Sequence, residues 1–191
     1  MLFSGLIMVF ALIAGCGGGD DNDTTAAAGG GGGAATPGVF VGQVEGTDDS
    51  IALVTDGNRL TAAYLCIPDS TSQWVRPAPL QDGQAGLVAR RGVNLGSATF
   101  SGDTANGTVD AGGQHNFGAK LATGYVGLYR VTSGKANKPP YSETGWIVLP
   151  DGTVCGGTNT ITAGGGFKSG PAPSKPEGSG RVTDFANPTP F

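Results

Sequence analysis

Two side chains of this sequence, His115 and Glu143, could act as an acid or a base in catalysis. His115 is the single histidine and follows Gly112-Gly113-Gln114, so we interpret it as a residue beside a hairpin turn, without an evident base or nucleophile as partner. Glu143 precedes Trp146 and is the most conspicuous acid, but a strand end is its simpler interpretation. A glycosidase needs two facing acids. Most aspartates occupy turns or the N-terminal segment, where turn chemistry accounts for them: Asp20, Asp21, Asp23, Asp48, Asp49, Asp56, Asp103 and Asp151.

Motifs for metals, nucleophiles and phosphates are missing from the sequence. It contains no C-x-x-C pair, no G-x-S-x-G elbow and no Gly-rich loop ending in Lys-Ser/Thr. The run Asp20-Asp21-Asn22-Asp23 lacks the glycine and the distal glutamate of a calcium-binding loop. We therefore predict no catalytic residue, no metal and no cofactor.

Cys66 and Cys155 are the two cysteines of the predicted domain. The apolar run from Leu2 to Ala14 predicts export. An even cysteine pair then favours a disulfide, because exported proteins fold under oxidising conditions. The alternative is two buried thiols too far apart to join.

The charge pattern argues against nucleic-acid binding. The formal net charge is −4, and Arg90-Arg91 is the only adjacent basic pair. Phosphate binding needs clustered Lys and Arg. We interpret Arg90-Arg91 as a solvated turn or strand end.

Aromatic side chains could form a binding surface. The candidates are Trp74, Trp146, Tyr125, Tyr129 and Tyr141, of which Trp74, Trp146 and Tyr129 are the preferred ones. Because aromatics make up only 7% of the chain, the core needs most of them, and burial is the preferred interpretation.

Short β-rich runs separated by turns must position these residues. Asp56-Gly57-Asn58 and Asp151-Gly152 are strong turn signals. In the strand from Arg59 to Cys66, alternation places Leu60, Ala62, Tyr64 and Cys66 on one face. Many short strands with local hairpins predict an all-β fold, a small antiparallel meander that forms a closed or nearly closed barrel, with a β-sandwich as the alternative.

The first residues predict export. From Leu2 to Ala14 the chain is almost wholly apolar, too short for a bilayer span of about 20 residues and typical of a secretory signal. No Lys or Arg precedes the run, where such signals usually carry positive charge. It ends in Ile13-Ala14-Gly15-Cys16, which resembles the bacterial lipobox. This resemblance implies cleavage before Cys16 and acyl chains such as palmitate on it, which anchor the protein to a membrane on the extracytoplasmic side.

These signals divide the chain into four segments. We expect a signal peptide over residues 1–15, a lipidated cysteine and a Gly/Asp/Ala-rich tether over 16–37, a β domain over 38–167 and an unstructured Pro/Gly-rich tail over 168–191.

Three segments of the domain carry a further resemblance. They are Tyr64-Leu65-Cys66 before an isolated Trp74, then Gly127-Leu128-Tyr129-Arg130, and Gly145-Trp146-Ile147-Val148-Leu149-Pro150-Asp151-Gly152. In order and spacing they resemble uncharacterised actinobacterial exported proteins, from about residue 39 to 155. The resemblance implies a secreted β domain in the cell envelope, and it supplies no catalytic residue.

Our hypothesis is a membrane-anchored envelope lipoprotein whose non-enzymatic β domain binds an envelope protein or a small ligand. One alternative is a hydrolase acting on wall or lipid material, which a polar cleft with Glu143 or His115 paired to another ionisable group would favour. Another is a carrier of small apolar ligands, which requires an open barrel interior.

Overall fold

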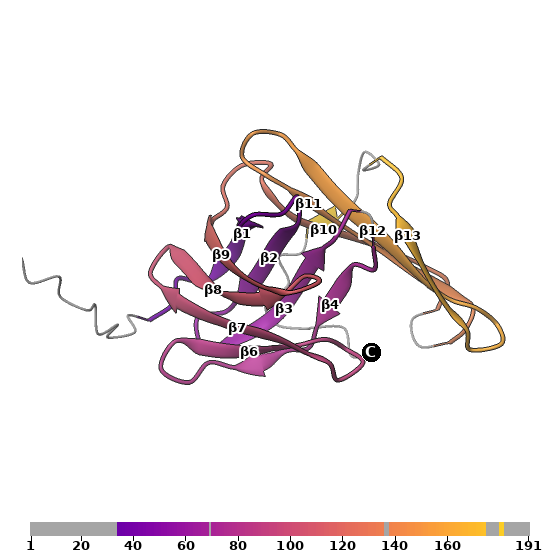
Figure 1. Cartoon of the computed structure of the whole chain (residues 1–191), viewed down its shortest axis with the longest axis horizontal. Coiled ribbons are helices and arrows are strands. Elements are labelled where there is room, and N and C mark those ends of the chain that lie inside the picture. The colour runs from indigo at the N-terminus through magenta and orange to yellow at the C-terminus, as the bar shows by residue number, and fades with distance from the viewer. Residues whose placement is uncertain (1–33, 69, 136–137, 175–179, 182–191) are drawn as a thin grey trace, which may run out of the picture. The chain divides into compact units, whose positions relative to one another are not determined.

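The computed structural model describes residues 34–68, 70–135, 138–174 and 180–181. All regular elements in these ranges are β-strands (Figure 1). The described part of the chain includes no helix with the length and apolar character needed to cross a bilayer. The expected signal peptide, Cys16 and the first part of the expected tether lie outside the described residues.

The first nine strands form one antiparallel sheet with the order β4-β3-β2-β1-β9-β8-β7-β6, and β5 pairs with β3. Their bounds are β1 Gly38–Val44, β2 Ser50–Thr55, β3 Arg59–Cys66, β4 Gln73–Val75, β5 Ala78–Pro79, β6 Gln84–Val88, β7 Asn94–Ser101, β8 Thr104–Asp110 and β9 Gln114–Leu121.

The two ends of this sheet meet, which nearly closes it into a barrel. In the middle of the strand order, β1 joins the two halves by pairing with β2 on one side and with β9 on the other. Between β4 and the end of β6, Val75 and Ala89 form an antiparallel bridge, and the Arg90 backbone N–H donates to the Trp74 carbonyl at 3.0 Å. The predicted all-β, nearly closed antiparallel barrel is therefore confirmed.

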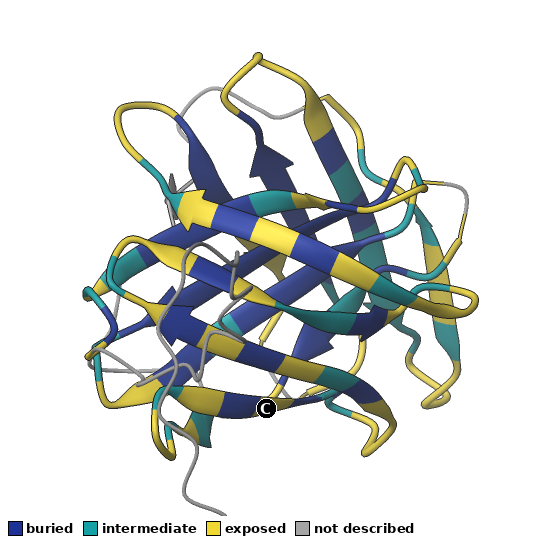
Figure 2. Ribbon diagram, turned by 60° about the vertical axis from the view of Figure 1, so that its left-hand side comes forward, coloured by how far each residue is buried: buried dark blue, intermediate teal, exposed yellow. Residues whose placement is uncertain are grey.

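Packed side chains fill the barrel interior. Phe40 and Phe100 meet edge to face, with ring centroids 5.3 Å apart. Around them lie buried aliphatic and aromatic residues that include Val44, Ile51, Leu53, Leu60, Leu65, Leu87 and Phe117. β7 alternates between buried and exposed positions, as Figure 2 shows in bands along the barrel strands. This alternation is the pattern of strands with one face on a core and one face in water.

The later part of the chain forms a second antiparallel sheet, with the order β13-β12-β11-β10-β14. Its strands are β10 Gly127–Ser133, β11 Tyr141–Val148, β12 Val154–Ile161, β13 Phe167–Pro171 and β14 Gly180–Arg181. The sequence did not predict this separate layer, and the domain boundary expected at residue 167 falls at the start of β13. Residues 167–171 join the sheet because every residue of β13 pairs with β12.

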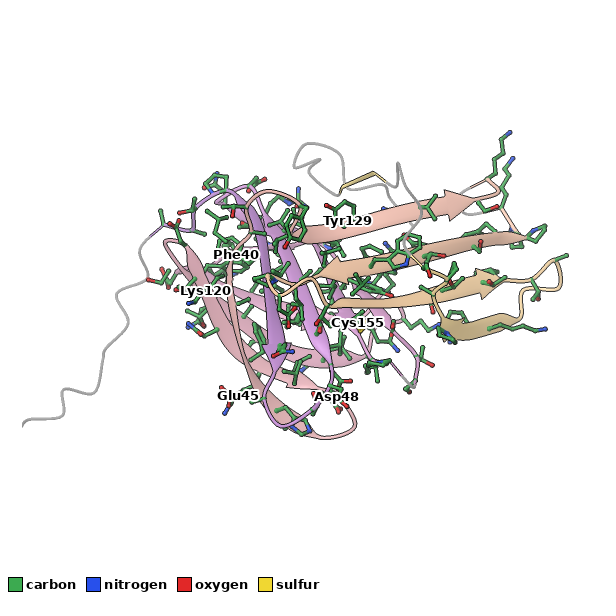
Figure 3. The ribbon with its side chains drawn as sticks, turned by 90° about the horizontal axis from the view of Figure 1, so that it is seen from above. Phe40, Glu45, Asp48, Lys120, Tyr129 and Cys155 are labelled. Atoms are coloured by element: carbon green, nitrogen blue, oxygen red, sulfur yellow. A yellow bond between two sulfur atoms is a disulfide. The ribbon has the colours of Figure 1, made fainter. Side chains whose placement is uncertain are left out.

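The second sheet covers the outer face of the barrel at β1 to β3. All six residues of β2 are buried, because Ile51 and Leu53 face the barrel interior whereas Ala52 and Val54 face the second sheet. A disulfide joins Cys66 on β3 to Cys155 on β12. Figure 3 labels Cys155, which lies where the second sheet meets the barrel. The predicted disulfide is confirmed.

Two smaller expectations need correction. Leu60 does not share a face with Tyr64 and Cys66, because a β-bulge shifts the register of β2 and β3 beside it, and Leu60 enters the barrel interior. At the end of the expected tether, Ala35 is buried and forms a parallel bridge with Gly102. Residues of that segment therefore belong to the domain.

Candidate functional site

Two glycines let the second sheet approach the barrel closely. A Cβ on Gly145 of β11 would lie 2.8 Å from Tyr64 Cζ and 2.9 Å from Trp74 Cζ2. A Cβ on Gly157 of β12 would lie 3.0 Å from the Tyr64 hydroxyl, which donates a hydrogen bond to the Gly157 carbonyl at 3.0 Å. Burial raises the pKa of Tyr64 to about 12. The contact between the sheets is therefore tight at these glycines.

Beyond this contact lies a pocket of about 240 Å³. The barrel contributes residues of β4 and of the segment after β6, and the second sheet contributes residues of β11, β12 and β13. The lining residues are Gln73, Trp74, Arg90, Arg91, Tyr141, Glu143, Asn159, Ile161 and Phe167. This pocket is the candidate functional site.

Glu143 lies at the centre of an ion cluster on the pocket wall. Only 3% of this residue is exposed. Arg90 donates hydrogen bonds to both of its carboxylate oxygens, and Arg130 Nε lies 2.5 Å from Oε1. The two arginines give this buried carboxylate the cationic partners that a buried charge needs. Glu143 is thus a paired residue inside β11, and its interpretation as a strand end was wrong.

Backbone contacts position Arg90 for this role. Its N–H donates to the Trp74 carbonyl, and its own carbonyl accepts a hydrogen bond from Arg76 Nε at 2.9 Å. Burial lowers the pKa of the Arg90 guanidinium to about 10, and the charge of Glu143 opposes that shift. Arg90 is therefore a half-buried cation at neutral pH, and its interpretation as a solvated residue was wrong.

Trp74 lies beneath the arginines. The guanidinium carbons of Arg90 and Arg130 lie 5.1 and 5.4 Å from its ring centroid, within the range of cation–π attraction. On another side its ring contacts Tyr64, with centroids 4.5 Å apart. Trp74 is 4% exposed, and its Nε1 finds no hydrogen-bond acceptor among the described residues.

Arg91 stands at the solvent side of the same pocket. Its guanidinium carbon lies 3.6 Å from the centroid of the Phe167 ring, and the residue is exposed. The ion pairs found in the described ranges involve Arg90, Arg130 and Glu143 and leave Arg91 without a carboxylate. Arg91 thus adds a positive charge at the pocket that the described ion pairs leave unmatched, in a chain whose formal net charge is −4.

The other candidate residues do not gather at this pocket. Trp146 and Tyr129 are buried together on the opposite face of the second sheet, beside Ala172. The Trp146 indole N–H donates to the Pro173 carbonyl at 2.9 Å. His115 lies on β9 beside the hairpin turn, with Nδ1 3.2 Å from the Glu45 carbonyl oxygen. Of the predicted binding aromatics, Trp74 and Tyr141 contribute to the pocket.

Sequence reasoning missed Arg130, Asn159 and Phe167, and it set Arg91 aside. One signal was present for Glu143, because it stands four residues before Ile147 and two before Gly145, in phase with the buried face of β11. An acid in phase with buried residues needs a cation as partner. The partners themselves have no local signal, since Arg90 is 53 residues away.

No group of three or more His, Cys, Asp or Glu side chains suited to a metal occurs among the described residues. No family model, curated protein or solved structure matches this chain. The resemblances to lipobox proteins and to actinobacterial exported proteins therefore stay predictions.

Proposed function

We propose that this chain is an exported lipoprotein, anchored to a membrane of the cell envelope by lipid on Cys16, whose β domain binds a ligand or partner through the pocket between its two sheets. The observation that carries the binding role is the exposed guanidinium group of Arg91 at the pocket. Arg91 offers guanidinium donors that none of the observed ion pairs uses. Guanidinium groups match carboxylate and phosphate oxygens in geometry and charge.

Hydrolysis is the weaker alternative, although Glu143 is paired with ionisable groups at the pocket wall. Its partners are arginines, and both of its oxygens accept hydrogen bonds from Arg90. A carboxylate whose two oxygens are both occupied by arginine donors is poorly placed to exchange a proton with a substrate. Glu143 is also the one acid among the residues that line the pocket, whereas a glycosidase uses two.

The barrel interior is a weaker candidate for a ligand than the pocket. The Phe40 and Phe100 rings and the aliphatic side chains around them occupy it. A carrier would need an apolar cavity there. We therefore place the binding role at the pocket between the sheets.

The anchor is tested by replacing Cys16. Cys16→Ala should release the chain from the membrane fraction and abolish its labelling by an alkyne fatty acid. A matched control is Cys16→Ala combined with Thr25→Cys, which keeps the number of cysteines and should also stay unlabelled. Labelling that persists in Cys16→Ala contradicts the anchor.

The binding role is tested by photo-crosslinking in intact cells. A photoreactive phenylalanine analogue at Tyr141 lies on the pocket wall, whereas the same analogue at Val154 is exposed elsewhere on the second sheet. We expect an adduct, detected as a defined mass increase, from position 141 and not from 154, and its loss with Arg91→Glu. Equal adducts from both positions would show that the pocket has no special role.

A further inference from the structure

We propose that the pocket binds a small aromatic carboxylate, whose acid group pairs with Arg91 and whose ring lies against the apolar side chains of the pocket wall. This inference deepens the proposed function and rests on it. It concerns the chemical class of the ligand, for which the charge, the lining and the size of the pocket each provide an argument.

The exposed guanidinium group of Arg91 favours an anionic ligand. Arg91 takes part in none of the ion pairs formed by the described residues, whereas Glu143 lies on the buried side and pairs with Arg90 and Arg130. Arg91 is exposed and lies over the Phe167 ring, at 3.6 Å from its centroid. Stacking on a ring restricts the guanidinium before a ligand arrives, so less conformational entropy is lost on binding.

The apolar residues of the pocket wall favour an anion that carries a flat apolar group. Four of the nine lining residues present aromatic or aliphatic groups, namely Trp74, Tyr141, Ile161 and Phe167. An inorganic anion would leave these groups in contact with water. A ring would cover them, and aromatic pairs gain energy beyond that of buried area.

Size and hydrogen bonding restrict the ligand further. The pocket volume of about 240 Å³ is below the range of about 300–1,000 Å³ for drug-sized ligands, which favours a single ring with its acid group. Trp74 is buried, and its Nε1 finds no acceptor among the described residues, although buried donors are nearly always paired. Trp74 therefore has an indole donor that the described residues leave without an acceptor.

The two tryptophans provide an internal probe for the test. Trp74 lines the pocket, whereas Trp146 lies on the far face of the second sheet. Each gives one indole N–H signal in a ¹H–¹⁵N spectrum of the full chain, and Trp146→Phe assigns the two. Benzoate should move the Trp74 signal and leave the Trp146 signal in place. Benzamide, which has the same shape without the charge, and inorganic phosphate, which has charge without a ring, should leave both signals unmoved at the same concentration.

Substitutions test the assigned contact. Arg91→Gln should weaken benzoate binding tenfold or more, because it removes a charge-assisted hydrogen bond. Arg59→Gln is the matched control, since Arg59 is exposed and does not line the pocket, and it should bind as the wild type does. Equal binding of benzamide and benzoate, binding of phosphate, or an unchanged affinity of Arg91→Gln overturns the proposal.

Failure of the aromatic-carboxylate proposal can be distinguished from failure of the proposed binding function. A Trp74 signal that ignores benzoate, together with position-specific adducts from residue 141 in cells, rejects the aromatic carboxylate and retains the binding role. Absence of the adducts rejects the binding role in cells, whatever benzoate does in the purified protein.

Discussion

Arg90 and Glu143 pair across the space between the two sheets, although 53 residues separate them in the chain. Arg90 belongs to the segment that nearly closes the barrel, and Glu143 lies in the middle strand of the second sheet. Arg130 completes the cluster from β10. This ion cluster joins the two layers at the wall of the pocket, so its integrity can be measured through stability.

Glu143→Gln should lower the free energy of unfolding by about 3–5 kcal/mol, because removal of one partner of a buried ion pair leaves uncompensated charge. Both Arg90 and Arg130 lose the Glu143 carboxylate as an ion-pair partner in this variant. Urea unfolding followed by circular dichroism measures the change. Glu45→Gln, at an exposed position, should stay within about 0.5 kcal/mol of the wild type. A Glu143→Gln midpoint equal to that of the wild type would contradict the role of the cluster.

Loss of the disulfide should destabilise the domain strongly. Cys66 and Cys155 are separated by 89 positions, and the chain-entropy estimate for a loop of this size is about 4–5 kcal/mol. Unfolding of the wild type should therefore occur at lower urea concentration when a reductant opens the bond. The double variant Cys66→Ala with Cys155→Ala should resemble the reduced wild type and ignore the reductant. The idea fails if the reduced wild type unfolds at the same urea concentration as the oxidised protein.

Gly145→Ala should destabilise the contact between the sheets. Its Cβ would lie 2.8 Å from Tyr64 and 2.9 Å from Trp74, so both rings must move, at a cost of about 1–3 kcal/mol. Gly86→Ala is the matched control on β6, since nothing lies within 4 Å of its Cβ. That control should be neutral or more stable, because alanine lowers the entropy of the unfolded chain. Thermal melts compare the two, and equal effects would argue against close approach at Gly145.

Tyr64 should make stability depend on pH in the alkaline range. Burial raises its pKa from 10.0 to about 12 in the folded protein. The native state therefore holds this proton more tightly than the unfolded state, and the stabilisation present below pH 10 is lost as pH rises through about 12. Tyr64→Phe should abolish this part of the fall in the free energy of unfolding. Urea unfolding between pH 10 and 12 measures that free energy. Absorbance of tyrosinate provides a second readout, in which one of the four tyrosines should titrate late in the wild type and not in Tyr64→Phe.

Tyr64→Phe also removes the hydrogen bond to the Gly157 carbonyl, at a cost of about 1 kcal/mol at neutral pH. Tyr125→Phe is the control, because Tyr125 is 63% exposed. If all four tyrosines titrate together in the folded wild type, Tyr64 is not held in the environment described above.

Local features of the sequence were sufficient for the class of the fold. Asp56-Gly57-Asn58 lies in the tight connection of β2 and β3, where Gly57 has a φ of +95°. The Asp56 carboxylate accepts hydrogen bonds from the backbone N–H groups of Asn58 and Arg59. Such turns depend on a few neighbouring residues, so their chemistry can be read without the rest of the chain. The Cys66–Cys155 bond followed from the number of cysteines and the expected compartment.

The division of the strands between two sheets depended on tertiary packing. The apolar, partly β-branched run of β2 indicates a strand, but it does not say which layer covers the outward side of Ala52 and Val54. Likewise, β13 begins at the point where composition suggested a tail, because pairing with β12 outweighs the low strand propensity of glycine and proline.

The sequence by itself determined a β-rich chain with tight hairpins and a disulfide, because turn residues and alternating burial act over a few neighbouring positions. Only the tertiary structure brought Arg90, Arg91, Glu143 and Phe167 to one pocket. These residues come from elements that are far apart in the chain, and their meeting depends on how the second sheet packs on the barrel at Gly145 and Gly157. That packing is a property of the whole domain, which no single stretch of residues encodes.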